Sequence, residues 1–161
     1  MSNIEGMATM NAETAEFVKS GFTAAVPFAR TLGVEFLDVD YGRVVMRLPD
    51  AEAHHNHVGG PHAGAMFTLG ESASGAVVTG TFGELLDRCV PLAVKADIHY
   101  YKLAMGDMVA EARLTRPQEE IAGELDAGGR PEFAVEVELR TEDGTVTGAM
   151  TVTWTLKPNT R

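Results

Sequence analysis

The stretch HAGAMFTLGESASGAVVT, residues 62–79, decides the fold of this chain, because its length and its pattern both indicate a buried helix. It is too long for a β-strand, and it is apolar nearly all round, which is typical of a helix that contacts protein on every side. Glycines at positions 64, 70, 75 and 80 each lower helix stability by about 1 kcal/mol relative to alanine. We therefore expect this helix to lie in close contact with other backbone, as it would inside a curved sheet.

Outside this segment, apolar residues alternate with polar ones, which is the pattern of antiparallel strands with one wet face. The alternating runs cover residues 34–36, 44–48, 92–100, 108–114, 133–139 and 150–156. In the third run the pattern places Leu92, Val94, Ala96, Ile98 and Tyr100 on one face. The pair Asp143–Gly144 predicts a hairpin between the last two strands.

The flanking segments complete the predicted domain. Residues 12–25 have helical spacing, and Pro27 is expected to kink this helix or to begin a second short one. Residues 117–131 form an acidic, glycine-bearing insertion for which one short helical turn is expected. The order of elements predicts a single α+β domain over residues 11–161, with an antiparallel curved sheet wrapped around a central helix, after a flexible tail over residues 1–10.

Composition narrows the possible partners. The net charge of −10 disfavours nucleic acid as a partner, because an acidic surface repels phosphate backbones, and it weighs slightly against an acidic carrier protein.

No apolar stretch is long enough for a membrane span, and residues 1–16 lack the features of a signal peptide. Cys89 is the only cysteine, so no intrachain disulfide can form, and a cytoplasmic location is expected.

Coenzyme A stays compatible with the acidic composition, because its phosphates need only a local basic patch. The candidates for such a patch are Lys95, Lys102, Arg113 and Arg116. The simpler interpretation is that each of these four side chains lies on a strand and faces solvent without binding phosphate.

Glu71 is the only ionisable residue between His62 and Glu84, and it lies in the middle of the predicted buried helix. Burial disfavours the charged form of a lone carboxylate, so we expect its pKa to rise toward the range useful for acid–base chemistry. From the residues alone, a carboxylate that bonds a backbone amide or points to solvent is the alternative.

The loop before the helix, AHHNHVGGPHAG at residues 53–64, is the second candidate feature. Its glycines let backbone approach a ligand, and the helix start offers unpaired amides that can stabilise an oxyanion. A flexible solvated connector is the alternative. Histidines at positions 54, 55, 57 and 62 suggest a metal, but adjacent histidines diverge and the loop holds no cysteine or acidic ligand, so no metal site is expected.

The run Asn56-x-x-Gly59-x-x-His62-Ala63-Gly64, followed by Glu71, resembles the signature of hotdog-fold acyl-CoA thioesterases. In the phenylacetate-pathway and hydroxybenzoyl-CoA thioesterases, an Asn or Gln stands six residues before the His of a His-Gly-Gly, and an Asp or Glu stands nine residues after it. This chain meets both spacings. The wider pattern, over roughly residues 20 to 157 and including a late tryptophan, is still more similar to an uncharacterised hotdog family of thioesterase-like proteins.

The resemblance implies an acyl-thioester hydrolase, with acyl-CoA as the expected substrate and no cofactor apart from the coenzyme A of that substrate. It implies that Glu71 is a general base on water or, less readily, a nucleophile. It also implies that Asn56 orients the water or the carbonyl, that His62 shapes the loop, and that the amides near Ala63 and Gly64 polarise the carbonyl.

Two positions depart from the family pattern. Ala63 replaces the first glycine of the usual pair, which matters little if only its N–H is used. Gly75 stands where some relatives carry a threonine that helps to hold the water, and Ser72 or Ser74 is the candidate substitute.

The spacing also predicts a shared site. A helix rises about 1.5 Å per residue, so Glu71 lies roughly 13 Å from the His62 end of its own helix. The two groups can serve one carbonyl only if a second chain contributes one of them, so a homodimer or a dimer of dimers is expected.

Two other functions stay open at this stage. A hydroxyacyl-thioester dehydratase on the same fold pairs a loop His with a helix Glu fourteen residues later, and His57 and Glu71 have that spacing. Against this, Ala65-Met66 replaces the second Pro-Gly of those enzymes, and His54 stands where a hydratase Asp would be. A non-catalytic acyl-thioester binding protein is the other alternative.

Overall fold

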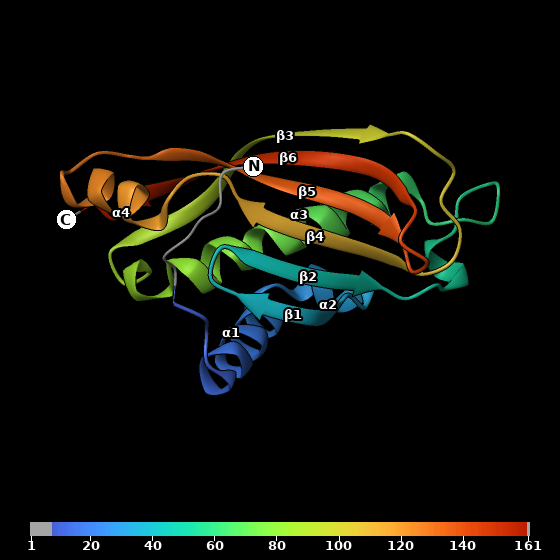
Figure 1. The fold of residues 1–161 in the computed structure, drawn as a ribbon, viewed down its shortest axis with the longest axis horizontal. Helices are drawn as coiled ribbons and strands as arrows, with labels where there is room; N and C mark the ends of the chain where they lie inside the picture. The colour runs from blue at the N-terminus through green and yellow to red at the C-terminus, as the bar shows by residue number, and fades with distance from the viewer. Residues whose placement is uncertain (1–7, 161) are drawn as a thin grey trace.

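The structure, a computed structural model, describes residues 8–160, and its six antiparallel strands form one sheet in the order β1-β2-β4-β5-β6-β3 (Figure 1). The strands are β1 (Glu35–Asp40), β2 (Arg43–Leu48), β3 (Cys89–Tyr100), β4 (Met108–Leu114), β5 (Glu132–Thr141) and β6 (Val146–Pro158). Helix α3 (Ala63–Thr81) runs along the inner face of this sheet and packs mainly against β2, β4 and β5. The α+β hotdog architecture expected from the sequence is confirmed.

The glycines of α3 make room for large side chains. A Cβ atom at Gly70 would lie 2.8 Å from the sulfur of Met150, and a Cβ atom at Gly80 would lie 3.2 Å from Val18. These neighbours are side chains of β6 and of helix α1 (Ala12–Ala25), whereas the sequence predicted contact with other backbone. Side-chain packing, rather than backbone approach, therefore accounts for these two glycines.

The N-terminal helices form as the sequence indicates. Asn11 caps α1 by accepting a hydrogen bond from the Thr14 N–H, and helix α2 (Pro27–Leu32) begins at Pro27, where a missing N–H is tolerated. The second of the two expectations for Pro27 is therefore confirmed. Of the predicted tail, residues 1–7 lie outside the described residues, and Met10 is buried with its N–H bonded to Asp40 Oδ1 at 2.7 Å.

Strand β3 differs from the sequence expectation because it contains a β-bulge. Its register with β6 shifts between Ala93 and Lys95, which leaves Val94 without a direct partner. Residues directly opposite each other share a face, so Ala93 lies on the face of Trp154, the same face as Ala96 opposite Val152, although Ala93 is itself exposed. Leu92 lies opposite Thr155 and faces outward, so the prediction that Leu92 shares a face with the later apolar residues of β3 is wrong.

The acidic insertion is more ordered than the sequence predicted. It forms helix α4 (Gln118–Asp126), nine residues long, where one short turn was expected. Ile121 and Leu125, four residues apart, are buried on one side of this helix and anchor it. Two apolar residues among acids and glycines gave too weak a pattern to predict it.

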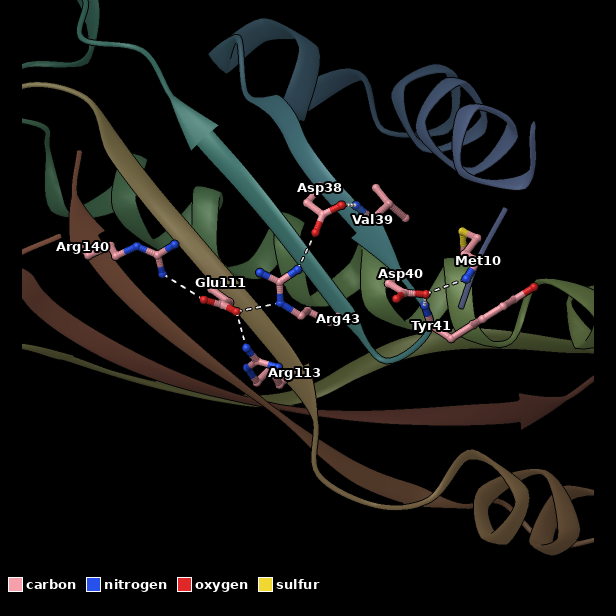
Figure 2. Close-up of polar contacts among 9 residues, drawn as sticks. All are labelled: Met10, Asp38, Val39, Asp40, Tyr41, Arg43, Glu111, Arg113 and Arg140. Carbon is pink, nitrogen blue, oxygen red and sulfur yellow. Dashed lines mark hydrogen bonds and ion pairs between the residues drawn. The ribbon is translucent and has the colours of Figure 1, made fainter. Parts of the chain in front are cut away.

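The outer face of the sheet is held by charged side chains, which Figure 2 shows around Glu111 of β4. The carboxylate of Glu111 accepts hydrogen bonds from Arg43 Nε at 2.7 Å, from Arg113 at 2.5 Å and from Arg140 at 3.1 Å. Desolvation alone would raise the pKa of Glu111, but these guanidinium groups outweigh it and lower the pKa. Arg43, Arg113 and Arg140 therefore neutralise Glu111 and link strands β2, β4 and β5 on the outer face of the sheet.

The two short 3-10 helices, η1 (Glu52–His54) and η2 (Gly83–Leu85), lie before and after α3 in the chain. Within residues 8–160, none of the helices has both the length and the apolar character that crossing a bilayer requires.

Candidate active site

The start of α3 is exposed and is held by side chains on two sides. His62 is the N-cap residue, and its Nδ1 accepts a hydrogen bond of 2.8 Å from the Gly64 N–H. The hydroxyl of Tyr100, at the end of β3, donates to the Ala63 carbonyl at 3.0 Å. Both atoms belong to the peptide group that joins Ala63 to Gly64, so this group is fixed from opposite sides.

The bond from the Gly64 N–H to His62 determines which N–H groups at the helix start can still bind a substrate oxygen. The Gly64 N–H already has a partner in His62, while the N–H groups of Ala63 and Ala65 have none among the described residues. These free N–H groups lie at the positive end of the helix dipole. In the present conformation, the Ala63 amide rather than the Gly64 amide is ready to receive an oxygen.

Asn56 organises the loop that leads into α3. Its side-chain oxygen accepts hydrogen bonds from the N–H groups of Val58 at 3.0 Å and Gly60 at 3.2 Å, and its amide nitrogen donates to Pro61 O at 3.4 Å. Its backbone N–H also donates to Gly60 O at 2.8 Å. The polar atoms of Asn56 are thus used inside its own loop, which keeps the residues before the helix start in place.

Close packing requires glycine at position 60 of this loop. A Cβ atom on Gly60 would lie 2.4 Å from the backbone oxygen of Ala104, in the segment between β3 and β4. This close backbone approach joins the loop of Asn56 to the residues that follow Tyr100.

Glu71 is the only charged residue of α3, and it is partly buried. Its carboxylate has no hydrogen bond or ion pair with any described residue, and desolvation raises its pKa. A carboxylate in this condition holds a proton more readily than usual and is a better base when ionised near neutral pH.

Trp154 holds the backbone beside Glu71. Its indole N–H donates to Ser74 Oγ at 3.1 Å, and Ser74 Oγ donates to the carbonyl oxygen of Glu71 at 2.7 Å. A Cβ atom on Gly75 would lie 3.4 Å from the Trp154 ring, so a larger side chain at position 75 would press on the indole. Ser72 is buried. The Trp154 ring therefore fills the space beside Gly75.

A surface cavity of about 380 Å³ opens beside the helix start. The sequence-predicted residues Asn56 and Ala63 line it, whereas Glu71, Ser72 and Gly75 do not. Tyr100, Tyr101 and Lys102 also line it, and of these three only Lys102 was a candidate binding residue from the sequence, as one of four cations. The role of Tyr100 could not be predicted, since its contact spans 37 positions of the chain and its alternating pattern indicates only a strand.

The four loop histidines do not gather. Among residues 8–160, no three His, Cys, Asp or Glu side chains come together as metal ligands. His55 bonds Asp50 Oδ1 at 2.7 Å, His57 is exposed, and the Nδ1 atom of His54 is buried without a hydrogen-bond partner among the described residues. His57 does not line the cavity, so the residue that would serve a dehydratase lies outside it.

The family model DUF4442, described as a domain of unknown function, matches residues 14–156. The chain belongs to the DUF4442 family. Among curated proteins, no sequence matches the chain.

Several solved structures that are described as thioesterases are similar to this DUF4442 protein. A Pseudomonas aeruginosa protein of unknown function, described as a "Probable Thioesterase", is similar with 26% identity and a TM-score of 0.79, over 96% of this chain and 100% of that one. A thioesterase family protein from Silicibacter pomeroyi has 21% identity and a TM-score of 0.73, with coverage of 89% and 98%. The PaaI protein of the E. coli phenylacetic acid degradation operon has 13% identity and a TM-score of 0.72, with coverage of 92% and 96%. The sequence resemblance to the hotdog thioesterase superfamily is thereby confirmed.

Proposed function

We propose that this DUF4442 protein hydrolyses acyl thioesters, with acyl-CoA as the expected substrate, at a site shared by two subunits. The observation that carries the proposal is Glu71, a partly buried carboxylate with a raised pKa and no partner among the described residues. A group kept in this state is suited to move a proton. The relatives described as thioesterases support the choice of thioester among carbonyl substrates.

The proposed reaction uses two groups of the protein. The Ala63 N–H binds the thioester oxygen and stabilises the negative charge that develops on it. Glu71 of the partner subunit takes a proton from water as the water oxygen bonds the carbonyl carbon. The tetrahedral intermediate then breaks its C–S bond, the thiolate leaves and takes the proton from the carboxyl, and the products are an acid and a thiol.

A second subunit is proposed because one chain does not bring the two groups to one cavity. Glu71 is absent from the lining of the cavity that Ala63 shares with Asn56. Strand β3 pairs with β6 on one side only, and its other edge has no strand beside it among residues 8–160. Val90, Leu92 and Val94 on this edge strand are exposed apolar residues, and a two-fold pairing of β3 strands would satisfy the free backbone groups of the edge and reduce the exposure of these side chains.

The test is hydrolysis of acyl-CoAs of varied chain length and shape by the purified protein and by Glu71→Gln. We expect turnover by the wild type and a loss of about 10²-fold or more in the variant. Equal hydrolysis by both proteins would refute the role of Glu71. Hydration of enoyl thioesters without hydrolysis, or tight binding of acyl-CoA without turnover, would replace the proposal by one of the two alternatives.

The amide can be removed without deleting a side chain. Ala63 is the first residue of α3, a position that accepts proline, and His62 before it has φ −61° and ψ 144°, which is compatible with a following proline. Ala63→Pro should therefore fold and lose about 10²- to 10³-fold in kcat.

Mixing the two inactive variants tests the shared site. In a mixed dimer of Ala63→Pro and Glu71→Gln chains, one site carries both defects and the other carries none. Random exchange of subunits should restore about one quarter of the wild-type activity. If mixing restores nothing although affinity capture of one differently tagged variant retains the other and so shows that mixed dimers form, both groups act within one chain and the shared site is wrong.

A further inference from the structure

Three of the four cations that the sequence singled out are bound to carboxylates. Lys95 lies 3.2 Å from Asp97, Arg113 lies 2.5 Å from Glu111, and Arg116 pairs with the carboxylate of Glu124. The fourth, Lys102, is exposed and has no carboxylate partner among residues 8–160. Lys157 also lacks such a partner among these residues, so Lys102 is set apart by its place in the cavity wall and not by the missing partner alone.

Lys102 is also the cation that lines the cavity at the start of α3. Its backbone is fixed, since the N–H groups of Tyr101 and Lys102 both donate to Thr147 O, at 2.8 and 3.2 Å. The neighbouring Ala104 touches Gly60 of the Asn56 loop, so the lysine and the helix start belong to one connected wall. The fold therefore fixes the backbone of Lys102 relative to Ala63, and the flexible side chain carries the ammonium group from that point.

Apart from Asn56, the rest of the lining is apolar or aromatic. It includes Pro61, Met66 and Leu103 together with the rings of Tyr100 and Tyr101. A cavity of about 380 Å³ with apolar walls and a few polar groups suits a slender organic arm. One cation beside such a cavity calls for an arm that carries a negative charge.

We propose that this cavity takes the phosphopantetheine arm of the thioester and that Lys102 binds its phosphate. This inference rests on the proposed function and narrows its substrates to thioesters that bear phosphate. The acidic chain would repel an acidic carrier protein, so coenzyme A is the favoured source of the arm. The chemistry of hydrolysis stays with the other residues, and Lys102 acts on binding alone.

The experiment compares thioesters that share one acyl group and differ in the arm: acyl-CoA, acyl-pantetheine without phosphate, and acyl carrier protein. Each is assayed with the wild type, with Lys102→Gln, and with Lys157→Gln, which removes another exposed lysine, at the far end of β6 and away from the cavity. We expect Lys102→Gln to raise the KM for acyl-CoA by roughly two- to fivefold with little change in kcat. The KM for acyl-pantetheine should be the same in all three proteins, and salt should reduce the effect on acyl-CoA.

Other outcomes overturn the proposal. An equal rise in KM for acyl-CoA and acyl-pantetheine would mean that Lys102 shapes the cavity without binding phosphate. An equal effect of Lys157→Gln would mean that overall charge decides. A Lys102-dependent preference for acyl carrier protein would support the phosphate site but assign it to the carrier.

Calorimetry with coenzyme A itself separates this inference from the proposed function. If the wild type hydrolyses no thioester but binds coenzyme A more tightly than Lys102→Gln does, the phosphate site stands and the proposed reaction fails. If hydrolysis is observed and coenzyme A binds both proteins equally, the reaction stands and the phosphate site fails.

Discussion

The hydroxyl of Tyr100 donates to the carbonyl of Ala63 at 3.0 Å, which ties the end of the edge strand β3 to the first residue of the central helix. The same peptide group donates its N–H, that of Gly64, to His62. Desolvation raises the pKa of Tyr100, so the phenol keeps its proton and stays a donor across the physiological range. An amide whose neighbour is fixed in this way is oriented before any substrate arrives.

Tyr100→Phe removes only the hydroxyl that makes this contact. We expect the fold to persist and kcat to fall about three- to tenfold, which corresponds to the about 0.5–1.5 kcal/mol of one neutral hydrogen bond. KM should change little, because the ring remains in the cavity wall. Tyr41→Phe is the control, since the Tyr41 hydroxyl has no hydrogen bond to any described residue and lies in the turn between β1 and β2. Equal kinetics of Tyr100→Phe and wild type would show that the contact does not orient the amide.

The sequence predicted the parts of this fold in which one period dominates. The apolar stretch that forms α3 and the alternating runs that form β4, β5 and β6 have strong patterns that tertiary contacts do not reverse. The bulge at Val94 was missed, because a bulge leaves alternation in the sequence intact while it rotates half of the strand. Helix α4 was missed because only Ile121 and Leu125 mark its buried side.

The candidate site shows a similar division. The unusual position of Glu71 could be predicted because a lone carboxylate in an apolar helix is visible in the sequence. The internal bonds of Asn56, the capping bond of His62 and the indole bond of Trp154 depend on side-chain geometry that spacing does not contain.

Glu71→Gln should make the folded protein more stable at neutral pH. The folded state raises the pKa of this carboxyl by desolvation, so folding is penalised when the group is ionised, and the amide removes that penalty. The penalty is full above the raised folded pKa, decreases as pH falls, and vanishes below the ordinary pKa of glutamate. Chemical denaturation at several pH values measures this difference, and Glu84→Gln, at an exposed position, is the control. A variant less stable than wild type at pH 7 would mean that the carboxylate has a stabilising partner.

Glu111→Gln should act in the opposite direction. The folded state lowers the pKa of Glu111, because three arginines outweigh its desolvation, so its charge stabilises the fold above the ordinary pKa of glutamate. That contribution is lost as pH falls through the lowered folded pKa. The variant should therefore be less stable than wild type at pH 7, and the gap should close in acid. Thermal melts over a pH series check this, and a gap that is constant with pH would assign the effect to packing.

Gly60→Ala should separate the two loops that form the cavity wall. The added methyl would meet the Ala104 carbonyl at 2.4 Å, and because that atom is backbone, one loop must move. We expect a loss of about 1–3 kcal/mol in the free energy of unfolding, together with a higher KM for the proposed thioester substrate. Gly21→Ala is the matched control, because Gly21 lies inside α1 with nothing within 4 Å of the added atom, and it should gain about 0.5–1 kcal/mol. If both variants gain stability, the two loops do not depend on the close approach at Gly60.

Gly75→Thr introduces the residue that the resemblance to hotdog thioesterases leads one to expect at this position. The Cβ atom would lie 3.4 Å from the Trp154 ring, and the two further atoms of threonine would press on the indole and weaken its bond to Ser74. We expect a loss of about 1–3 kcal/mol in the free energy of unfolding and lower thioester hydrolysis rather than higher. In a double-mutant cycle, Trp154→Leu should recover part of that loss, since the smaller side chain leaves room for threonine. Strict additivity of the two changes would mean that Trp154 is not what requires glycine at position 75.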